Sequence, residues 1–365
     1  MKKLLLFILF VCPILAGAQK IDLDRFRFTA KYRSLPKIKI DSSYRTYNVV
    51  VEGTKLMAPF LKEMLPEQTV LLDGWRKLPA NGHLCIKVNL DDLLPESVSL
   101  KERAEVIKNK TGQITGTRIY YYQEVKYSFA ATAVIKDYKG AHILDLNLNN
   151  RENKYVYNSP EFALKPLAEG YFLLNSLKIT ADLYRKCVNN AMHNLSETIT
   201  GDFGFSEVSS SDIMWIIDSR KHPEYAAHRQ AFQQLSDVFF SMNASNDISK
   251  IKEQVKPVIE YFESIKKNYS GISKHDRKIK YASYYNLAVL YYYLDDPQMM
   301  MKEAKGLLLN DFDSKDARGF EQTAIWLKNL FETTNIYTRH FSIETSSFKG
   351  PYEKDAAAAQ FTGLR

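Results

Sequence analysis

The chain has 365 residues, of which 45% are hydrophobic and 25% charged, and its formal net charge at pH 7 is +8. This apolar fraction excludes a wholly disordered or collagen-like chain. Three cysteines are too few for a miniprotein held together by disulfides, and the length suits one large domain or two ordinary ones.

The N-terminus has the layout of a secretory signal peptide. Lys2 and Lys3 precede an apolar run from Leu4 to Leu15, and the small residues Ala16-Gly17-Ala18 match a cleavage site. The run is shorter than the roughly 20 residues that span a bilayer. We therefore expect cleavage after Ala18 and a location in the periplasm or at the outer membrane. Loss of the two lysines leaves 48 basic against 42 acidic residues, so no nucleic-acid partner is expected.

Residues 19–158 have the pattern of antiparallel strands. The clearest alternation runs from His83 to Asp92, with apolar side chains on one face and polar ones, including His83, on the other. A hairpin turn is expected at Gly112, and a tight turn at 137–140. The expected strands are Tyr44–Val51, Gln68–Trp75, His83–Asp92, Lys101–Lys110, Gln113–Lys136 and Ala141–Leu148, with a short helix at Met57–Met64.

After residue 158 the hydrophobic period becomes helical. Ser159-Pro160-Glu161 and His222-Pro223-Glu224 each suit a helix start, because proline and an acidic residue are favourable in a first turn. Ser273 and Asp276 form a capping box, and further helices are expected through 248–265, from Pro297 and from Ser314. The expected domains are a signal peptide (1–18), a β-rich domain (19–158), bridging helices (159–205), a helical domain (206–335) and a C-terminal tail (336–365).

One helical pair resembles a tetratricopeptide repeat. Its first helix carries Tyr284, Leu287, Ala288 and Tyr291, and a turn at 295–297 leads into a second helix. The second helix carries Met300, Ala304, Leu307 and Leu308. The resemblance covers about one repeat, and it departs from the pattern at Met300, at Ala304 and in lacking the terminal proline. It implies a short degenerate stack of helical hairpins.

The fold class expected from these patterns is α+β, with an N-terminal antiparallel sheet domain followed by a helical domain with tetratricopeptide-like hairpins. The organisation of the whole chain is also similar to that of exported proteins of Bacteroidota-type bacteria. That similarity implies a cell-envelope address and no particular chemistry.

The common catalytic motifs are missing from the sequence. It has no G-x-S-x-G, no H-E-x-x-H, no Walker loop and no C-x-x-C. The cluster His222, Glu224 and His228 is interpreted as a helix start with a solvated Glu–His pair, since two imidazoles six residues apart do not share a helix face. We therefore expect no enzyme, cofactor or metal, and leave open whether Cys85 and Cys187 form a disulfide.

Tyrosine, with 23 residues, is the most unusual feature of the composition. Exposed tyrosines are enriched at protein interfaces. We therefore predict partner binding by Tyr284, Tyr291 and Tyr292 in the helical domain, and by Tyr120 and Tyr122 in the sheet domain. The expected function is a non-catalytic interaction or scaffold protein of the envelope, bound to envelope proteins and peripherally to the outer membrane.

Two alternatives stay open at this point. A glycan-binding module would place Tyr120, Tyr122 and Trp75 on one exposed sheet face. An envelope hydrolase would need converging polar groups in a cleft, such as His83 near Asp92.

Overall fold

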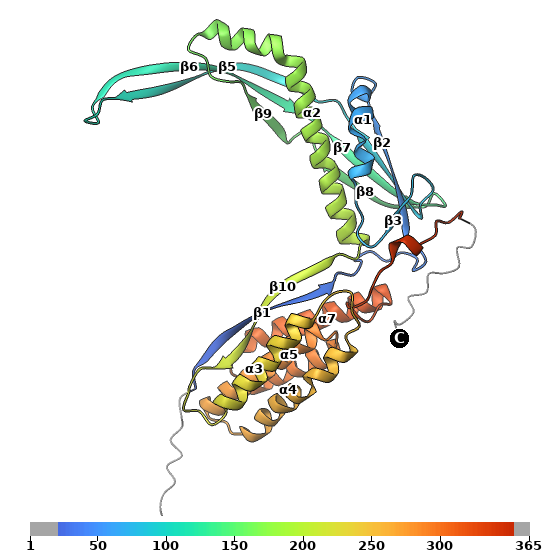
Figure 1. The fold of residues 1–365 in the computed structure, drawn as a ribbon, viewed down its shortest axis with the longest axis vertical. Helices are drawn as coiled ribbons and strands as arrows, with labels where there is room; N and C mark the ends of the chain where they lie inside the picture. The colour runs from blue at the N-terminus through green and yellow to red at the C-terminus, as the bar shows by residue number, and fades with distance from the viewer. Residues whose placement is uncertain (1–20, 354–365) are drawn as a thin grey trace, which may run out of the picture. The chain divides into compact units, whose positions relative to one another are not determined.

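The computed structural model describes residues 21–353, so the predicted signal peptide lies outside the described residues. Its fold class is α+β, as predicted (Figure 1). The chain forms two compact units. The helical unit contains residues 21–33 and 207–342, and the sheet unit contains 34–206 and 343–353. Residues 21–33 therefore belong to the same unit as the C-terminal helices. The domains expected from the sequence are instead consecutive ranges of the chain.

The sheet unit contains two sheets. Its five-stranded sheet has the order β3-β2-β4-β7-β8, in which β2 runs parallel to β3 and β4 while the other pairs are antiparallel. Its three-stranded sheet has the antiparallel order β5-β6-β9. The strands are β2 (Thr46–Gly53), β3 (Arg76–Lys77), β4 (Leu84–Leu90), β5 (Leu94–Lys108), β6 (Ile114–Ser128), β7 (Ala131–Asp137), β8 (His142–Asn149) and β9 (Lys154–Asn158). The helices are α1 (Ala58–Met64), η1 (Pro66–Thr69), α2 (Lys165–Phe203) and η2 (Thr345–Ser347).

Burial in the sheet unit follows the predicted alternation. Leu84, Ile86, Val88 and Leu90 of β4 are all buried, which confirms their common core face. The turn at Gly112 is also confirmed, with a left-handed φ of 82° that glycine adopts without strain.

Three predicted elements of the sheet unit are wrong. Residues 68–75 are not a strand, because η1 and a loop bury Trp75, whose indole nitrogen donates to the Phe203 carbonyl at 2.8 Å. The long strand after Gln113 ends at Ser128, and β7 crosses into the other sheet. The bridging region holds one 39-residue helix that begins at Lys165 rather than at Ser159. The chain before this helix stays bound to β6, since the Gln123 N–H donates to Ser159 Oγ at 2.9 Å.

The helical unit combines a two-stranded antiparallel ribbon with five helices. Strand β1 (Leu23–Arg33) pairs along its whole length with β10 (Glu207–Ile217), a strand that the sequence analysis does not predict. The helices are α3 (Tyr225–Ser241), α4 (Ser249–Asn268), α5 (Lys274–Tyr293), α6 (Pro297–Asn310) and α7 (Ser314–Thr334). The capping box of α5 is confirmed, because Ser273 Oγ accepts from the Asp276 N–H at 3.0 Å.

The predicted C-terminal tail is packed as far as residue 353. The Arg33 N–H donates to the Arg339 carbonyl at 2.8 Å, which fixes 336–342 in the helical unit. In the sheet unit, the Arg76 guanidinium donates to the Phe348 carbonyl at 2.6 Å. Among the helices of residues 21–353, none combines the length and hydrophobicity needed to cross a bilayer.

Candidate docking surfaces

The three tyrosines predicted on α5 take part in internal packing. Tyr291 is 6% exposed and belongs to the core of the helical unit. Tyr284 is half-buried beneath the Lys266 ammonium, 4.7 Å from its ring centroid, and it fills the space above Gly306. Tyr292 is half-buried as well, and the Arg339 guanidinium stacks on its ring at 4.4 Å. These rings therefore do not line an exposed groove.

The two tyrosines predicted on the sheet are half-buried on β6. The Arg103 guanidinium stacks on the Tyr120 ring at 5.0 Å and is held by Glu161, at 2.6 and 2.7 Å from its two carboxylate oxygens. Tyr122 lies opposite Lys101 in the β5–β6 register. Since Trp75 is buried, the exposed three-ring face expected of a glycan-binding module is not formed.

His83 and Asp92 do not form a polar site. They lie at opposite ends of β4, about 30 Å apart at the usual rise of a strand. His83 is buried rather than on the polar face, with Nδ1 2.7 Å from Thr46 Oγ1 and its ring stacked on Tyr44. Burial lowers the pKa of this imidazole. The pair therefore gives no support to a hydrolase.

The cluster His222, Glu224 and His228 is not the solvated pair expected from the sequence. His228 is fully buried, and its Nδ1 accepts from the Ile217 N–H at 3.4 Å. Glu224 accepts hydrogen bonds from the hydroxyls of Tyr261 and Tyr269. Among residues 21–353, no three His, Cys, Asp or Glu side chains converge as metal ligands, and Cys85 and Cys187 are free thiols.

A row of exposed leucines on the first part of α2 is the most conspicuous surface feature. We call Leu167, Leu173, Leu174 and Leu177 the leucine stripe; they are 53%, 76%, 88% and 88% exposed. At 3.6 residues per turn they fall within an arc of about 120°. Gly170 lies inside this arc, and a Cβ placed there would meet no atom within 4 Å. The opposite face is packed, with Ala168 buried and Tyr171 against Phe162.

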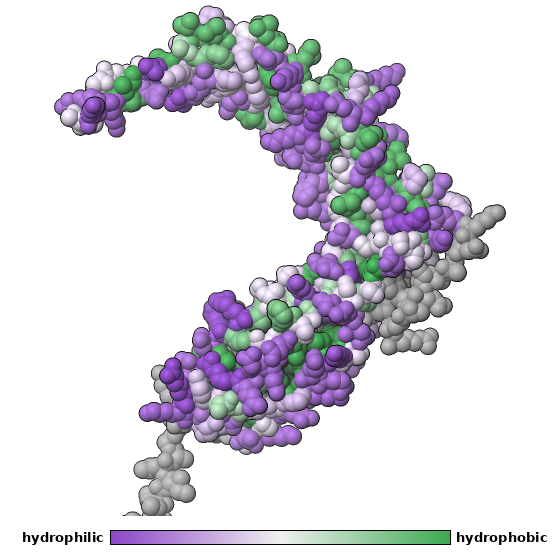
Figure 2. All heavy atoms as spheres, viewed as in Figure 1, coloured by the Kyte–Doolittle hydropathy of each residue, from purple (hydrophilic) through white to green (hydrophobic). Residues whose placement is uncertain are grey.

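Figure 2 shows the hydrophobic residues that gather over this part of α2, at the top of the view. Lys165, Glu169 and Lys178 are exposed on the same part of the helix, two cations to one carboxylate. Leucines recur in 164–177, and a second apolar stripe, which the structure buries, begins at Ile179. The helical period alone does not say which of two successive stripes faces the core.

The hairpin of β5 and β6 is a second exposed feature of the sheet unit. Its outer half extends beyond β9 (Figure 1) and exposes Val106, Ile107, Ile114 and Ile119. Residues 101–120 contain five basic and two acidic side chains. The outer half of the hairpin therefore has an apolar surface with an excess of positive charge.

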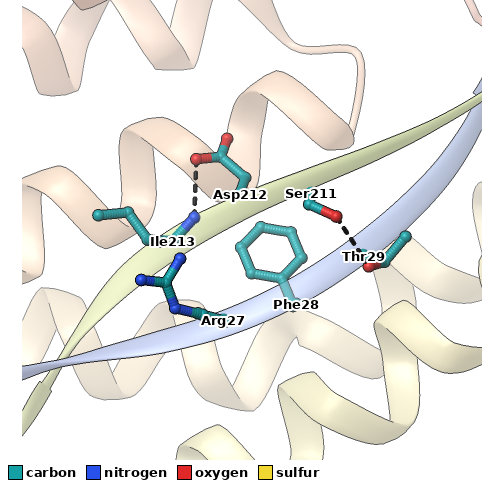
Figure 3. Close-up of a pocket in the computed structure, with 6 residues that line it drawn as sticks. All are labelled: Arg27, Phe28, Thr29, Ser211, Asp212 and Ile213. Atoms are coloured by element: carbon teal, nitrogen blue, oxygen red, sulfur yellow. Dashed lines mark hydrogen bonds between the residues drawn. The ribbon is translucent and has the colours of Figure 1, made fainter. Parts of the chain in front are cut away.

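The ribbon of the helical unit carries a hollow of about 360 Å³. Residues from the middle of both strands line it, and Figure 3 shows Arg27 on one side of the Phe28 ring and Thr29 and Ser211 on the other. The Thr29 and Ser211 hydroxyls are 3.2 Å apart. The Asp212 carboxylate accepts from the Ile213 N–H at 2.7 Å and from the Tyr293 hydroxyl at 3.1 Å.

Comparison with known proteins assigns no family. No protein-family model matches the chain, and no curated protein is similar to it in sequence.

Proposed function

We propose that this protein is a non-catalytic docking protein of the cell envelope, located in the periplasm or attached to an outer-membrane assembly. The leucine stripe of α2 is the observation that carries the proposal, because a soluble surface rarely exposes large apolar side chains in one row. The export signal expected at 1–18 and the resemblance of α5 and α6 to a tetratricopeptide hairpin support the same function.

The occupant of the stripe is an envelope protein that offers an apolar groove with an acidic rim. A helix docks in such a groove through apolar anchors on one of its faces. Leu167, Leu174 and Leu177 have the spacing of such anchors, at i, i+7 and i+10. Burial of one leucine contributes roughly 1.5–3 kcal/mol, so four exceed the lower estimates of the cost of association, about 4 kcal/mol. Lys165 and Lys178 outnumber Glu169 among the charged residues of 165–178, and this excess of positive charge favours the acidic rim.

The test compares the tagged, natively expressed protein with the double variant Leu174→Ser/Leu177→Ser. Gentle affinity purification from solubilised envelope, followed by crosslinking, identifies the partner, and its affinity is then measured with both purified proteins. We expect crosslinks from Lys165 or Lys178 and a loss of at least tenfold in affinity for the double variant. Both proteins should unfold at the same temperature, because the substituted side chains are exposed.

Leu309→Ser is the matched control, since Leu309 is 85% exposed on α6 and lies outside the stripe. It should leave the affinity unchanged. Equal affinity of the double variant and the original protein would contradict the assignment. Loss of liposome binding or of self-association, in place of partner binding, would reassign the stripe to lipid or to a second copy.

A further inference from the structure

One edge of strand β1 has backbone groups that no neighbouring strand covers. The Asp218 N–H donates to the Asp22 carbonyl, so the even-numbered residues of β1 face β10 and the odd-numbered ones face outward. The N–H of Arg33, another odd-numbered residue, also points away from β10 and donates to the Arg339 carbonyl. Among residues 21–353, the outward N–H groups of Arg27, Thr29 and Lys31 have no hydrogen-bond partner.

The matching edge of β10 is covered in part by side chains. The Asn286 amide of α5 accepts from the Trp215 N–H at 2.7 Å and donates to the Trp215 carbonyl at 2.8 Å. The Ile217 N–H reaches His228. The two edges of the ribbon therefore differ in what surrounds their open N–H groups. Among the described residues, those of β1 lie beside Arg25, Arg27 and Lys31, whereas those of β10 belong to Glu207, Ser209 and Ser211.

The outer face of the ribbon is cationic along β1. Arg25, Arg27 and Lys31 are exposed on this face, at alternate positions of one strand. None of the three forms an ion pair within the part of the chain that the structure describes, although the Arg25 guanidinium lies 5.8 Å from the Trp215 ring centroid. The facing residues of β10 include the hydroxyls of Ser209 and Ser211. The hollow at Arg27 leaves room on this face for a side chain of a ligand.

We propose that β1 accepts an acidic, extended segment of an envelope protein as a third strand of the ribbon. The segment places carboxylates at alternate positions beside Arg25, Arg27 and Lys31. Cross-strand neighbours of opposite charge stabilise a sheet. This inference rests on the proposed docking function and deepens it, but it uses no residue of the leucine stripe.

The open edge selects a polypeptide among possible polyanions. Outward N–H and C=O groups repeat along β1, and an added strand can pair with both, whereas a phosphate or sulfate chain pairs only with the cations. A second copy of β1 is disfavoured as occupant, since its own Arg25, Arg27 and Lys31 would bring like charges together.

The test uses a labelled synthetic peptide in which glutamate alternates with threonine, titrated into the complete mature protein. Matched probes are the same composition in blocks, the lysine–threonine analogue, and inorganic polyphosphate. We expect binding of the alternating acidic peptide above all others, weaker at high salt. Hydrogen exchange should slow at the amides of Arg27, Thr29 and Lys31 when this peptide binds.

Two pairs of variants separate charge from strand addition. The charge reversal Arg27→Glu/Lys31→Glu should weaken binding at least tenfold, while reversal of the exposed Lys250 on α4 should not. Thr29→Pro removes an outward N–H from β1 and should abolish binding. Ser209→Pro removes the corresponding N–H from the edge of β10 and should not.

Equal binding of polyphosphate, or full binding by Thr29→Pro, would overturn strand addition. Absence of peptide binding would also overturn strand addition. The charges of Arg25, Arg27 and Lys31 would then serve to prevent edge-to-edge aggregation of β1. The stripe variant Leu174→Ser/Leu177→Ser should bind the peptide normally. If the peptide does not bind but docking through the leucine stripe is observed, this inference alone is rejected. If the peptide binds but docking through the leucine stripe is not observed, the proposed function is rejected.

Discussion

Arg339 and Asp295 form an ion pair in the interior of the helical unit. Arg339 Nε donates to Asp295 Oδ1 at 2.6 Å, and the two side chains are 1% and 0% exposed. The guanidinium also lies between the rings of Tyr32 and Tyr292, 4.2 and 4.4 Å from their centroids. This pair joins β1, the end of α5 and the returning segment 336–342.

Asp295→Asn should lower the free energy of unfolding by about 3–5 kcal/mol, because it leaves a buried guanidinium without its counter-charge. Asparagine tolerates the left-handed φ of 57° at this position, so backbone strain does not add to the effect. Urea unfolding measures the change. Glu332→Gln, in the exposed pair with Lys328, is the control and should change stability by less than about 0.5 kcal/mol. A cost below 1 kcal/mol for Asp295→Asn would contradict the role of the pair.

Local sequence rules predict the elements whose pattern is regular. Alternation finds β4, the capping residues find the start of α5, and Gly112 finds the β5–β6 turn. Strand β10 is missed because Ser209-Ser210-Ser211-Asp212 interrupts its hydrophobic alternation. Its partner β1 is more than 170 positions away, and no local rule reports such a pairing.

The candidate surfaces are harder to predict than the elements. The sequence does not distinguish Tyr291 or Tyr292 from an exposed tyrosine. In the structure Tyr291 is a core residue and Tyr292 packs against Arg339. The packing of Tyr292 depends on Arg339, 47 positions later. The leucine stripe poses the reverse difficulty, because leucine on a helix normally indicates a core face.

Asn286 offers a second test of the ribbon. Its buried amide makes two hydrogen bonds with the backbone of Trp215, as a neighbouring strand would. Asn286→Ala leaves the Trp215 N–H and carbonyl unpaired and should cost about 2–3 kcal/mol. The Trp215 amide should also exchange faster with solvent. Gln298→Ala on the exposed surface of α6 is the control, and equal stability of the two variants would refute the bracing role.

Because of His228, the free energy of unfolding should decrease as the pH is lowered. Burial lowers its pKa to about 3, whereas the unfolded chain takes up this proton near pH 6.5. Below pH 6.5 the unfolded state therefore binds more protons than the folded state, and stability falls as the pH falls toward 3. Each pH unit in this window costs up to about 1.4 kcal/mol.

His228→Gln removes this titration. The stability gap between the original protein and the variant should narrow by about 1 kcal/mol per unit between pH 6 and pH 4, measured by urea unfolding. Burial also lowers the pKa values of His222 and His340, but both proteins share those groups and their effects cancel. Gln298→Ala, which changes no titratable group on the exposed surface of α6, should show a constant gap. A constant gap for His228→Gln would mean that the folded protein admits the proton.

Gly82 marks a close approach between the chain before β4 and the start of β2. A Cβ at this position would lie 2.5 Å from the carbonyl carbon of Tyr47 and 2.7 Å from the Asn48 nitrogen. The Gly82 N–H also donates to Asn48 Oδ1 at 2.8 Å, so the backbone has little freedom to move away.

Gly82→Ala should therefore cost about 1–3 kcal/mol or more, because it forces the parallel β2–β4 pair apart at its first residues. Gly116→Ala is the matched control, since a Cβ on this exposed part of β6 meets no atom within 4 Å. It should be neutral or slightly stabilising, as alanine restricts the unfolded chain more than glycine does. Urea unfolding of both variants measures the difference. If Gly82→Ala proves as stable as Gly116→Ala, the two strands are farther apart in solution than the distances to Tyr47 and Asn48 require.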